Sequence, residues 1–521
     1  MMNTGERSDR TVVIGAGMGG LATALRLAAA GREVTVIEMA PGPGGKARTL
    51  PSPAGPVDTG PTVLTMRWVA DELFALAGQR MEEGVDIIPL PELARHYWPD
   101  GSQLVLYPDA EANIAAIRDF AGPAEAEAFR RFDRLASELF ASFDGPVMQA
   151  GKPQLGQIAR AALRRPGLWR ALAPGMTLER LLQSHFRDPR LVQLFGRYAT
   201  YVGGRPAQTP AVLSLVWRAE ATGVWAIRQG MHGLAEALMR GAMALGVEFR
   251  FGTRARRIIR QQGRVSGVEI DGGATLRCGT CVFNGDPGAL AEGRLGDAAQ
   301  AALARPGAAR RSLSAWVWAF AAKPLGPVLG HHTVFFTANP GQEFGPIGQG
   351  QMPLDPTLYV CAQDRGWAAT PTGPERFEII MNGPAGIDRR EGEESECRTR
   401  TFQTLARHGL TFRPEPELTG LTSPQRLAEL YPGSRGAIYG ASPEGTMAAF
   451  RRPTARTGLP GLYLAGGGVH PGPGVPMALL SGKLAARAVL EDLTSASPPA
   501  RTATPGGMLT GSRMTARAPS R

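Results

Sequence analysis

The chain has 521 residues, of which 43% are hydrophobic and 20% are charged, and its formal net charge is +11. This length exceeds that of one ordinary hydrophobic core, so we expect two domains, and the composition excludes a disulfide-rich miniprotein and a wholly disordered chain. Four cysteines in 521 residues predict no disulfide framework and a reducing compartment, the cytoplasm.

The positive charge is concentrated in two segments. Residues 155–190 carry seven arginines against Glu179 and Asp188, and residues 496–521 carry four arginines and no acidic residue. Basic repeats with interleaved aromatic residues and zinc-finger spacings are absent from the sequence, so nucleic acid is not an expected partner. No segment has the apolar length of a membrane-spanning helix, and the tail 496–521 is predicted to be disordered.

The N-terminal region predicts a β-turn-α-β unit. TVVI at 11–14 is a short apolar strand, residues 21–30 have helical composition before Gly31, and VTVIE at 34–38 is a second strand. The Gly- and Pro-rich segment 41–61 is predicted to be a loop.

The turn of this unit carries a dinucleotide-binding pattern, Gly15-x-Gly17-x-x-Gly20. Gly15 allows the tight turn, Gly17 lets the backbone approach a pyrophosphate, and Gly20 lets the helix pack on the strand. Glu38, at the end of the second strand, is placed to bind a ribose. The pattern in this context predicts a bound dinucleotide rather than a plain structural turn.

The following loop bears on which dinucleotide binds. Gly44 and Gly45, followed by Lys46 and Arg48, would offer backbone amides and two cations to a second phosphate region, which favours FAD over NAD. The alternative is an ordinary Gly/Pro turn with exposed basic residues.

The middle of the chain is predicted to be helical over 110–240, with strands within 246–270, 310–320 and 376–381. The basic stretch 155–190 interleaves arginine with leucine and Trp169. This is typical of a helix lying on an anionic membrane surface, and equally of a solvated basic face. Trp316, Trp318 and Phe320 alternate along one strand face, where they would line a substrate tunnel or pack in the core.

The C-terminal region repeats the features of a nucleotide site. A strand at 461–466 runs into the glycine triplet 466–468, and an amphipathic helix follows over 477–493. Dinucleotide elements at both ends of one chain imply that the ends meet. The expected fold class is therefore α/β, with an FAD-binding Rossmann-like domain and a substrate domain inserted between its segments.

These motifs resemble the bacterial phytoene desaturase family of FAD-dependent carotenoid oxidoreductases. The resemblance rests on TVVIGAGMGGLATALRLAAAG, PGPGGKART, VDTGPTVLT and AGGGVHPGPGVP, and it covers roughly residues 10–495. Val469 and Pro473 depart from the family pattern, at positions that concern local backbone contacts. The resemblance implies a FAD-binding domain of the glutathione reductase/amine oxidase type over 10–75, 226–300 and 436–495. It also implies a mixed α+β domain facing substrate and membrane over 76–225 and 301–435.

A narrower resemblance is to the 1-hydroxycarotenoid 3,4-desaturases of purple bacteria, also called hydroxyneurosporene or methoxyneurosporene dehydrogenases. It rests on DTGPTVLTMRWVADELFA, LARHYWPDGS, FGRYATYVGGRPAQTPAVLSLVW, VFNGDPGAL and SLSAWVWAF. It implies insertion of a C3–C4 double bond into a 1-hydroxy or 1-methoxy acyclic carotenoid, in spheroidene or spirilloxanthin biosynthesis. The alternatives are a phytoene desaturase or carotenoid isomerase of the same family, and a non-enzymatic carrier of apolar chains like the Rab GDP-dissociation inhibitors.

The resemblance also assigns site residues. Trp225 and His232 lie in a segment similar to the family's flavin-facing loop, where Trp225 would contact substrate and His232 is a candidate proton acceptor or hydroxyl anchor, or else a structural or surface histidine. Trp316 and Trp318 are candidate substrate contacts on their own strand. No other catalytic residue is predicted. The predicted FAD contacts are Gly15, Gly17, Gly20, Glu38, Gly45, Lys46, Arg48, Gly60, Pro61, Thr62, Ala255, Gly467, Gly474, Val475 and Met477.

The remaining expectations concern partners and metals. We expect a cytoplasmic protein on the surface of the inner photosynthetic membrane, with an acyclic carotenoid as substrate. Cys278 and Cys281 are predicted to be inert, His331 and His332 to be a solvated pair, and no metal site is expected. The sequence predicts neither the oligomeric state nor the electron acceptor.

Overall fold

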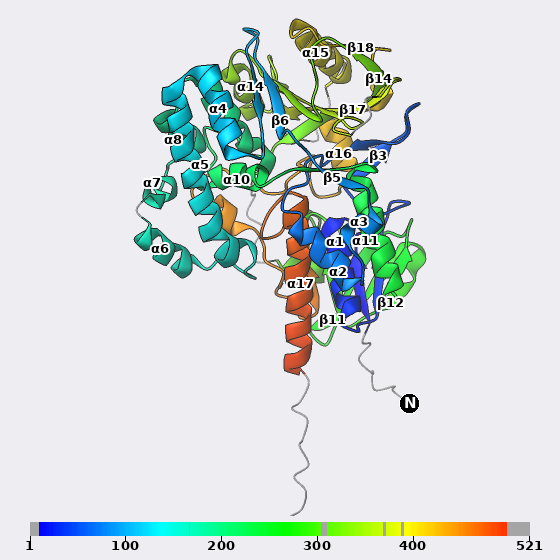
Figure 1. The fold of residues 1–521 in the computed structure, drawn as a ribbon. Helices are drawn as coiled ribbons and strands as arrows, with labels where there is room; N and C mark the ends of the chain where they lie inside the picture. The colour runs from blue at the N-terminus through cyan, green and yellow to red at the C-terminus, as the bar shows by residue number, and fades with distance from the viewer. Residues whose placement is uncertain (1–9, 166, 304–309, 368–370, 387–389, 497–521) are drawn as a thin grey trace, which may run out of the picture.

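Two β-sheets organise the computed structural model, one in each half of the molecule, with helices packed around them (Figure 1). The structure describes residues 10–165, 167–303, 310–367, 371–386 and 390–496. The chain passes between the halves several times, so each half is built from segments far apart in sequence. Except for Ala496, the predicted disordered tail 496–521 lies outside the described residues.

The first sheet has five parallel strands in the order β20-β13-β1-β2-β9. These are β1 (Thr11–Ile14), β2 (Val34–Ile37), β9 (Glu248–Arg250), β13 (Thr280–Phe283) and β20 (Leu462–Leu464). β1, β2, β13 and β20 are buried along their whole length, as expected for parallel strands covered on both faces. The strands predicted near both ends of the chain are thereby confirmed.

The two faces of this sheet are covered differently. Val13, Val36 and Val282 pack against helices, whereas Val12 and Ile14 pack against a small antiparallel sheet. The helices are α1 (Met18–Ala29), α2 (Trp68–Leu76), α3 (Met81–Gly84), α11 (Gly230–Ala244) and α17 (Val475–Ala496). The small sheet is β10 (Ala255–Gln261), β11 (Arg264–Ile270) and β12 (Thr275–Arg277).

α1 and α17 join the two ends of the chain. A Cβ atom at Gly482 would lie only 2.4 Å from the carbonyl oxygen of Gly19, so the two helices approach at backbone distance. Thr23 Oγ1 also donates a hydrogen bond to the carbonyl oxygen of Gly482 at 3.3 Å. This contact brings the N-terminal and C-terminal glycine-rich turns to the same side of the sheet.

The segment 41–61 was predicted to be a loop, but part of it is folded into strands. It contains a short antiparallel hairpin, β3 (Arg48–Leu50) and β4 (Val57–Thr59). The prolines and glycines responsible for the loop prediction fall largely outside these strands, and Gly55, with φ +100°, lies in the turn between them.

The second sheet has eight strands in the order β18-β14-β17-β16-β15-β6-β7, with β19 also paired to β14. The strands are β6 (Ala94–Tyr97), β7 (Gln103–Leu106), β14 (Ser314–Leu325), β15 (His332–Phe335), β16 (Leu358–Ala362), β17 (Glu375–Gly383), β18 (Thr411–Arg413) and β19 (Leu421–Thr422). A separate pair is formed by β5 (Ile87–Pro89) and β8 (Trp225–Ile227).

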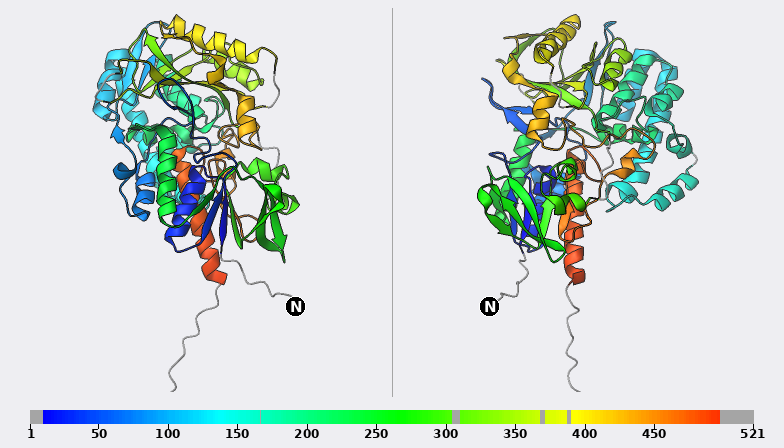
Figure 2. Two further views of the ribbon diagram at one scale, coloured as in Figure 1. Left: turned by 90° about the vertical axis from the view of Figure 1, so that its right-hand side faces the viewer. Right: turned by 180° about the vertical axis from the view of Figure 1, so that it is seen from behind.

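A helical group packs beside this sheet and confirms the helical prediction for 110–240. It includes α4 (Ala110–Ala121), α5 (Pro123–Phe143), α8 (Leu178–His185), α9 (Pro189–Gly196) and α10 (Leu215–Ala221). Figures 1 and 2 place α6 (Leu155–Arg164) and α7 (Leu168–Leu172) at the outer edge of this group. The remaining α-helices are α12 (Pro287–Ala291), α13 (Asp297–Ala301), α14 (Pro340–Gly348), α15 (Glu393–Arg407) and α16 (Pro424–Leu430).

The strands of the two sheets fall in different predicted segments, although α3, which packs on the first sheet, lies within 76–225. All five parallel strands fall within 10–75, 226–300 and 436–495, and all eight strands of the second sheet fall within 76–225 and 301–435. The boundaries themselves stay a prediction. Among the described residues, none of the helices combines the length and apolar character needed to cross a bilayer.

Candidate active site

A cavity of about 1430 Å³ lies between the two halves and takes its walls from both. Small-molecule sites usually measure about 300–1,000 Å³, so this cavity has room for a cofactor and a second long ligand. One end is lined by glycine-rich turns next to the five-stranded sheet. The other end is lined by the eight-stranded sheet, by α5 and α10, and by η2 (Arg197–Val202).

The turn between β1 and α1 forms part of the first end. Gly15, with φ +102°, and Gly17 both line the cavity. Gly17 is the N-cap of α1 and supplies no side-chain cap, so the first N–H groups of the helix are available to a ligand. Gly20 has a different role, because a Cβ there would lie 2.0 Å from the carbonyl oxygen of Gly15. Gly20 therefore lets the helix pack against its own turn.

Glu38 lies beside this turn with both carboxylate oxygens engaged. Oε2 accepts a hydrogen bond from the Ala16 amide at 2.8 Å, and Oε1 accepts one from the Ala40 amide at 2.9 Å. The side chain lines the cavity and is largely buried. Its position at the end of β2 is the one that the sequence predicted for a ribose ligand.

The loop after β2 folds back onto the first turn. The Gly44 amide donates to the carbonyl oxygen of Ala16 at 2.9 Å, and Gly45, Lys46 and Arg48 all line the cavity. Lys46 Nζ donates to the carbonyl oxygen of Ile438 at 2.6 Å, and burial lowers the pKa of this amine. The loop therefore adds backbone amides and two cations to the same end of the cavity.

A third turn follows β4 and contains Gly60, Pro61 and Thr62, all of which line the cavity. Asp58 holds this region to α11, since its carboxylate accepts hydrogen bonds from the backbone amides of Met231 and His232. Burial raises the pKa of Asp58 to about 6.

His232 also lines the cavity, and its Nδ1 lies 3.0 Å from the carbonyl oxygen of Ala47. Because a carbonyl oxygen only accepts, Nδ1 carries the proton. Nε2 lies 3.5 Å from Oε1 of Glu236. The imidazole thus links α11 to the loop that contains Lys46.

The C-terminal turn closes this end of the cavity. Gly467 and Gly474 line it, and Gly474 has φ +102°. α17 begins immediately afterwards, and its first residues, Val475, Pro476 and Met477, also line the cavity. The positive end of a long helix therefore faces the same space as the positive end of α1.

The comparison with protein families decides what this site holds. A family model described as flavin containing amine oxidoreductase matches residues 18–361 and 394–490. The chain belongs to this family. A flavin carried by a dinucleotide-binding turn is FAD, so the predicted cofactor is confirmed and this flavoprotein is an FAD-dependent oxidoreductase.

The chain is also similar to individual curated proteins. It is 63% identical to the hydroxyneurosporene desaturase of Rhodobacter capsulatus over 93% of this chain and 98% of that protein. It is 57% identical to the hydroxyneurosporene desaturase of Cereibacter sphaeroides over 94% of this chain and 99% of that protein. These relatives confirm the resemblance that the motifs predicted.

Solved structures confirm the predicted fold class. The crystal structure of the CLA-producing fatty acid isomerase from P. acnes is 14% identical to this chain. The superposition covers 93% of this chain and 99% of the isomerase chain, with a TM-score of 0.58. At this identity the similarity concerns the fold alone, which in this flavoprotein is the FAD-dependent amine oxidase fold.

The residues at the glycine-rich end fit FAD. Gly15 and Gly17 are backed by Asn284, since Cβ atoms on these glycines would approach it to 3.5 and 3.1 Å, respectively. Asn284 donates to the carbonyl oxygen of Gly15 at 3.2 Å, while its buried Oδ1 has no hydrogen bond among the described residues. Ala255, at the start of β10, lines the cavity as well. Of the predicted FAD contacts only Gly20 does not line the cavity, and the roles of the others stay predictions.

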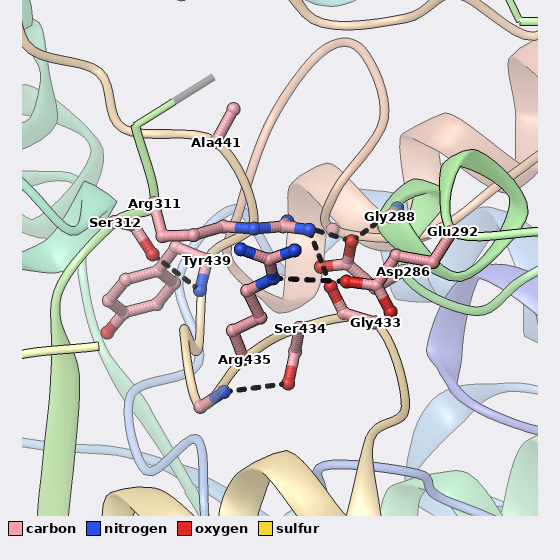
Figure 3. A network of polar contacts seen from close by, with 12 residues as sticks. Asp286, Gly288, Glu292, Arg311, Ser312, Gly433, Ser434, Arg435, Tyr439 and Ala441 are labelled. Atoms are coloured by element: carbon pink, nitrogen blue, oxygen red, sulfur yellow. Dashed lines mark hydrogen bonds and ion pairs between the residues drawn. The ribbon is translucent and has the colours of Figure 1, made fainter. Parts of the chain in front are cut away.

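A polar network holds the two halves together beside the cofactor end (Figure 3). Arg311, just before β14, donates to Asp286 Oδ1 at 3.0 Å and to the carbonyl oxygen of Gly433. Arg435 donates to Glu292 Oε1 at 3.0 Å. Asp286 itself lines the cavity. The network ties the segment after β13 to the segments that lead into and out of the eight-stranded sheet.

The other end of the cavity is mainly apolar. Its walls come from η1 (Asp144–Met148), η2, η3 (Ala211–Ser214), α5, α10 and the inner face of the eight-stranded sheet. The apolar lining residues are Phe140, Phe143, Val147, Met148, Val212, Leu213, Leu215, Val216, Ala219, Ala315, Val317, Val334, Ile380 and Phe450. This composition suits a long hydrocarbon ligand.

The structure corrects the expected placement of three tryptophans. Trp316 and Trp318 point to the outer face of β14 and pack in a core with Phe377 and α15, while Ala315 and Val317 face the cavity. Strand alternation put both indoles on one face, as predicted, but that face is covered by a helix. Trp225 in β8 packs beside Gly223 and is likewise not part of the cavity lining.

Sequence reasoning missed several buried polar residues of the substrate half. Glu378 on β17 is fully buried and accepts a hydrogen bond from the Gly60 amide at 2.6 Å, and burial raises its pKa well above the usual range. Arg197 and Glu220 line the cavity and are buried as well. Glu220 and Glu378 belong to no quoted motif, and Arg197 lies in the segment FGRYATYVGG without a pattern that marks its role, so only the fold brings them to the site.

His331 and His332 were predicted to be a solvated pair, and this prediction is wrong. His332 lies in β15, an interior strand of the sheet, and its Nδ1 is 2.6 Å from the hydroxyl of Tyr359. Burial lowers the pKa of both His331 and His332. Ligand atoms of these two histidines and Cys361 lie within 4.8 Å of one another. Cys278 and Cys281 are buried free thiols, and burial raises the pKa of Cys278 to about 12, in agreement with inert cysteines.

Proposed function

We propose that this flavoprotein is a carotenoid desaturase that inserts the C3–C4 double bond into 1-hydroxy or 1-methoxy acyclic carotenoids. The observation that carries the proposal is its 63% identity, over nearly the full length of both chains, to a protein named hydroxyneurosporene desaturase. The long apolar extension of the cavity supports it, because a carotenoid is an extended hydrocarbon. The proposed setting is carotenoid biosynthesis in photosynthetic bacteria.

The reaction defines what the protein must do. Desaturation breaks one C–H bond on each of two neighbouring carbons and forms a second bond between those carbons, so a proton and a hydrogen with its electron pair leave. When bound, FAD supplies the two-electron oxidation chemistry. The tasks left to the chain are to hold the C3–C4 bond at the cofactor, to exclude water and to receive a proton.

The chain offers His232 as a proton acceptor, and we keep this role as a proposal. The residue lines the cavity next to the turn of Gly60, and the hydrogen bond from Nδ1 to Ala47 leaves Nε2 as the basic nitrogen. His232→Ala is expected to lower turnover about 100-fold or more while FAD stays bound. Unchanged turnover would exclude His232 from the chemistry.

We propose that the substrate is collected from a membrane surface by α6 and α7. Leu163 is 74% exposed and Trp169 is 56% exposed, and Arg160, Arg164 and Arg170 lie among them in the sequence. Exposed apolar side chains interleaved with arginine suit an anionic lipid surface. Binding to anionic liposomes should weaken as salt is raised. No binding at low salt would exclude this surface as a docking site.

A substrate panel tests the desaturase proposal. FAD-loaded protein is mixed with liposomes that carry phytoene, neurosporene or 1-hydroxyneurosporene, and the products are separated by chromatography. We expect a product with one additional conjugated double bond from the hydroxylated carotenoid alone. Conversion of phytoene, or isomerisation without net oxidation, would instead assign the chain to a sister activity of the family.

A further inference from the structure

An arginine–glutamate pair is buried in the wall of the substrate cavity. Arg197 in η2 is 7% exposed and Glu220 in α10 is 2% exposed, and both line the cavity. Arg197 Nη2 lies 3.7 Å from Glu220 Oε1, which is an ion pair without a hydrogen bond. Both elements belong to the helical group that covers the apolar end, so these charges stand among hydrocarbon side chains.

The pair retains unused hydrogen-bonding capacity. Among the described residues, neither Nε nor Nη2 of Arg197 has a hydrogen-bond acceptor, and Glu220 Oε2 has no donor. Buried charged groups are normally hydrogen-bonded, because leaving them unpaired is costly. The buried pair Arg205–Glu444 behaves normally, with hydrogen bonds at 2.8 and 3.1 Å, and it does not line the cavity. The unpaired atoms at Arg197 and Glu220 therefore indicate a ligand.

Neighbouring tyrosines fix how the pair is presented. The Tyr198 hydroxyl donates to Glu220 Oε1 at 2.7 Å, so Oε2 is left as the unused acceptor. The Arg197 guanidinium lies over the Tyr201 ring, 5.0 Å from its centroid. One wall thus holds N–H donors and a carboxylate acceptor side by side. The unpaired atoms are buried, so a ligand reaches them when the two side chains turn toward the cavity. A hydroxyl group, which both accepts and donates, can satisfy both.

The pair lines the same cavity as the turn that is predicted to approach the flavin. The Thr62 hydroxyl is 2.7 Å from that of Tyr359, which is 2.6 Å from His332 Nδ1. Thr62 and Tyr359 line the same cavity as Arg197 and Glu220. Thr62 itself belongs to the turn predicted to approach the flavin.

The proposed substrate carries an oxygen that needs a polar partner in this cavity, and the inference below rests on that proposed function. The oxygen on C1 is joined to C3 by three bonds of about 1.5 Å each, so it lies within about 4 Å of the nearer reacting carbon. A polar group that binds this oxygen must therefore stand near the cofactor, in a wall that is otherwise apolar.

We propose that Arg197 and Glu220 bind the free hydroxyl on C1 of the substrate, with the guanidinium donating a hydrogen bond to its oxygen and the carboxylate accepting a hydrogen bond from its O–H group. The pair then sets which chain end enters and fixes the C3–C4 bond at the cofactor. It also selects the hydroxylated carotenoid over the methoxylated one, since a methoxy oxygen accepts a hydrogen bond but leaves Glu220 Oε2 without a donor.

The test compares three ligands with the wild-type protein and its variants. FAD-loaded protein is titrated with 1-hydroxyneurosporene, 1-methoxyneurosporene and neurosporene in micelles, and binding is followed by quenching of tryptophan fluorescence. The wild type should bind the hydroxylated ligand about 10- to 100-fold more tightly than neurosporene, with the methoxylated ligand between them. Arg197→Met and Glu220→Gln should bring the ratio of hydroxylated to unsubstituted affinity close to one.

Control variants separate recognition from folding. Arg205→Met removes a buried arginine–glutamate pair outside the cavity, and Tyr198→Phe removes only the hydroxyl that holds Glu220 Oε1. Arg205→Met should lower stability and leave the affinity ratio unchanged, and Tyr198→Phe should change the ratio less than Glu220→Gln. FAD content, read from flavin absorbance, should equal that of the wild type in every variant.

Two outcomes would overturn the proposal. The first is equal binding of the three ligands by the wild type, which needs no variant to fold. The second is an unchanged affinity ratio in both Arg197→Met and Glu220→Gln. In either case desaturation of the hydroxylated carotenoid by the wild type would show that the proposed function stands without this anchor. Failure of the wild type to bind or oxidise any hydroxylated carotenoid would refute the proposed function itself.

Discussion

Replacing Glu343 with glutamine should stabilise the protein at alkaline pH and not at acidic pH. Glu343, on α14, accepts hydrogen bonds from Asn382 Nδ2 at 2.9 Å and from the Thr357 amide at 3.4 Å. Asn382 and Thr357 line the cavity, so this carboxyl supports the substrate wall. Burial raises the pKa of Glu343 to about 7 from a reference value of 4.5.

The sign of the effect follows from these two pKa values. Below the unfolded value both states keep the proton, and Glu343 imposes no penalty. Between 4.5 and about 7 the unfolded chain releases the proton while the folded protein keeps it, so stability falls as pH rises. Above that range the penalty is constant, and 1.36 kcal/mol per pKa unit makes it about 3 kcal/mol.

The variant Glu343→Gln removes this penalty and gives up one long hydrogen bond, from Thr357, of about 1 kcal/mol. Its free energy of unfolding should therefore exceed that of the wild type by about 2 kcal/mol near pH 8, and the two should be equal within about 1 kcal/mol near pH 5. Urea denaturation of the FAD-loaded proteins at the two pH values measures the difference. Glu429→Gln, at an exposed position of α16, is the matched control and should change stability by less than about 0.5 kcal/mol at both pH values. A Glu343→Gln effect that does not depend on pH would refute the reasoning.

Three further predictions concern the cofactor and the core. Gly17→Ala adds a methyl group at the cavity wall, 3.1 Å from Asn284 Nδ2, and should weaken FAD binding about 10-fold or more. Gly151→Ala, where no atom lies within 4 Å and φ is not positive, should keep FAD, and full flavin absorbance in both variants would contradict this account of the turn. Glu378→Gln keeps an acceptor for the Gly60 amide and should retain FAD. Glu378→Leu leaves that amide unpaired at a cost of about 1–3 kcal/mol and should release FAD at a lower dilution than the wild type does. Trp318→Ala should lower stability by about 3–5 kcal/mol without changing which carotenoids are converted by the protein that stays folded; a changed product pattern would return Trp318 to the substrate path.

The nucleotide-binding half was largely predictable from the sequence, because its signals are local. The turn at Gly15 and Gly17 and the position of Glu38 all follow from a strand, a tight turn and a helix within thirty residues. The contact between α1 and α17 was inferred from two such motifs at opposite ends of the chain. The hairpin within 41–61 was missed because composition marks the turn and not the short strands beside it.

The substrate half was less predictable because its polar residues come from separate elements. Alternation placed Trp316 and Trp318 on one face, but only tertiary packing decides whether that face meets a helix or a cavity. Arg197 and Glu220 come from different helices, and although Arg197 lies in the segment FGRYATYVGG, nothing in that segment pairs it with Glu220. For Glu378, its partner Gly60 lies 318 residues away in sequence.

The most direct measurement of the central claim is a single-turnover experiment without oxygen. FAD-loaded protein is mixed with an excess of 1-hydroxyneurosporene in liposomes, and the carotenoids are extracted and separated by chromatography. Because each bound FAD takes up one electron pair, we predict up to one molecule of the 3,4-desaturated product per bound FAD, and none with protein stripped of FAD. An unchanged carotenoid, or an isomer of equal mass, would contradict the proposal that this cavity carries out desaturation.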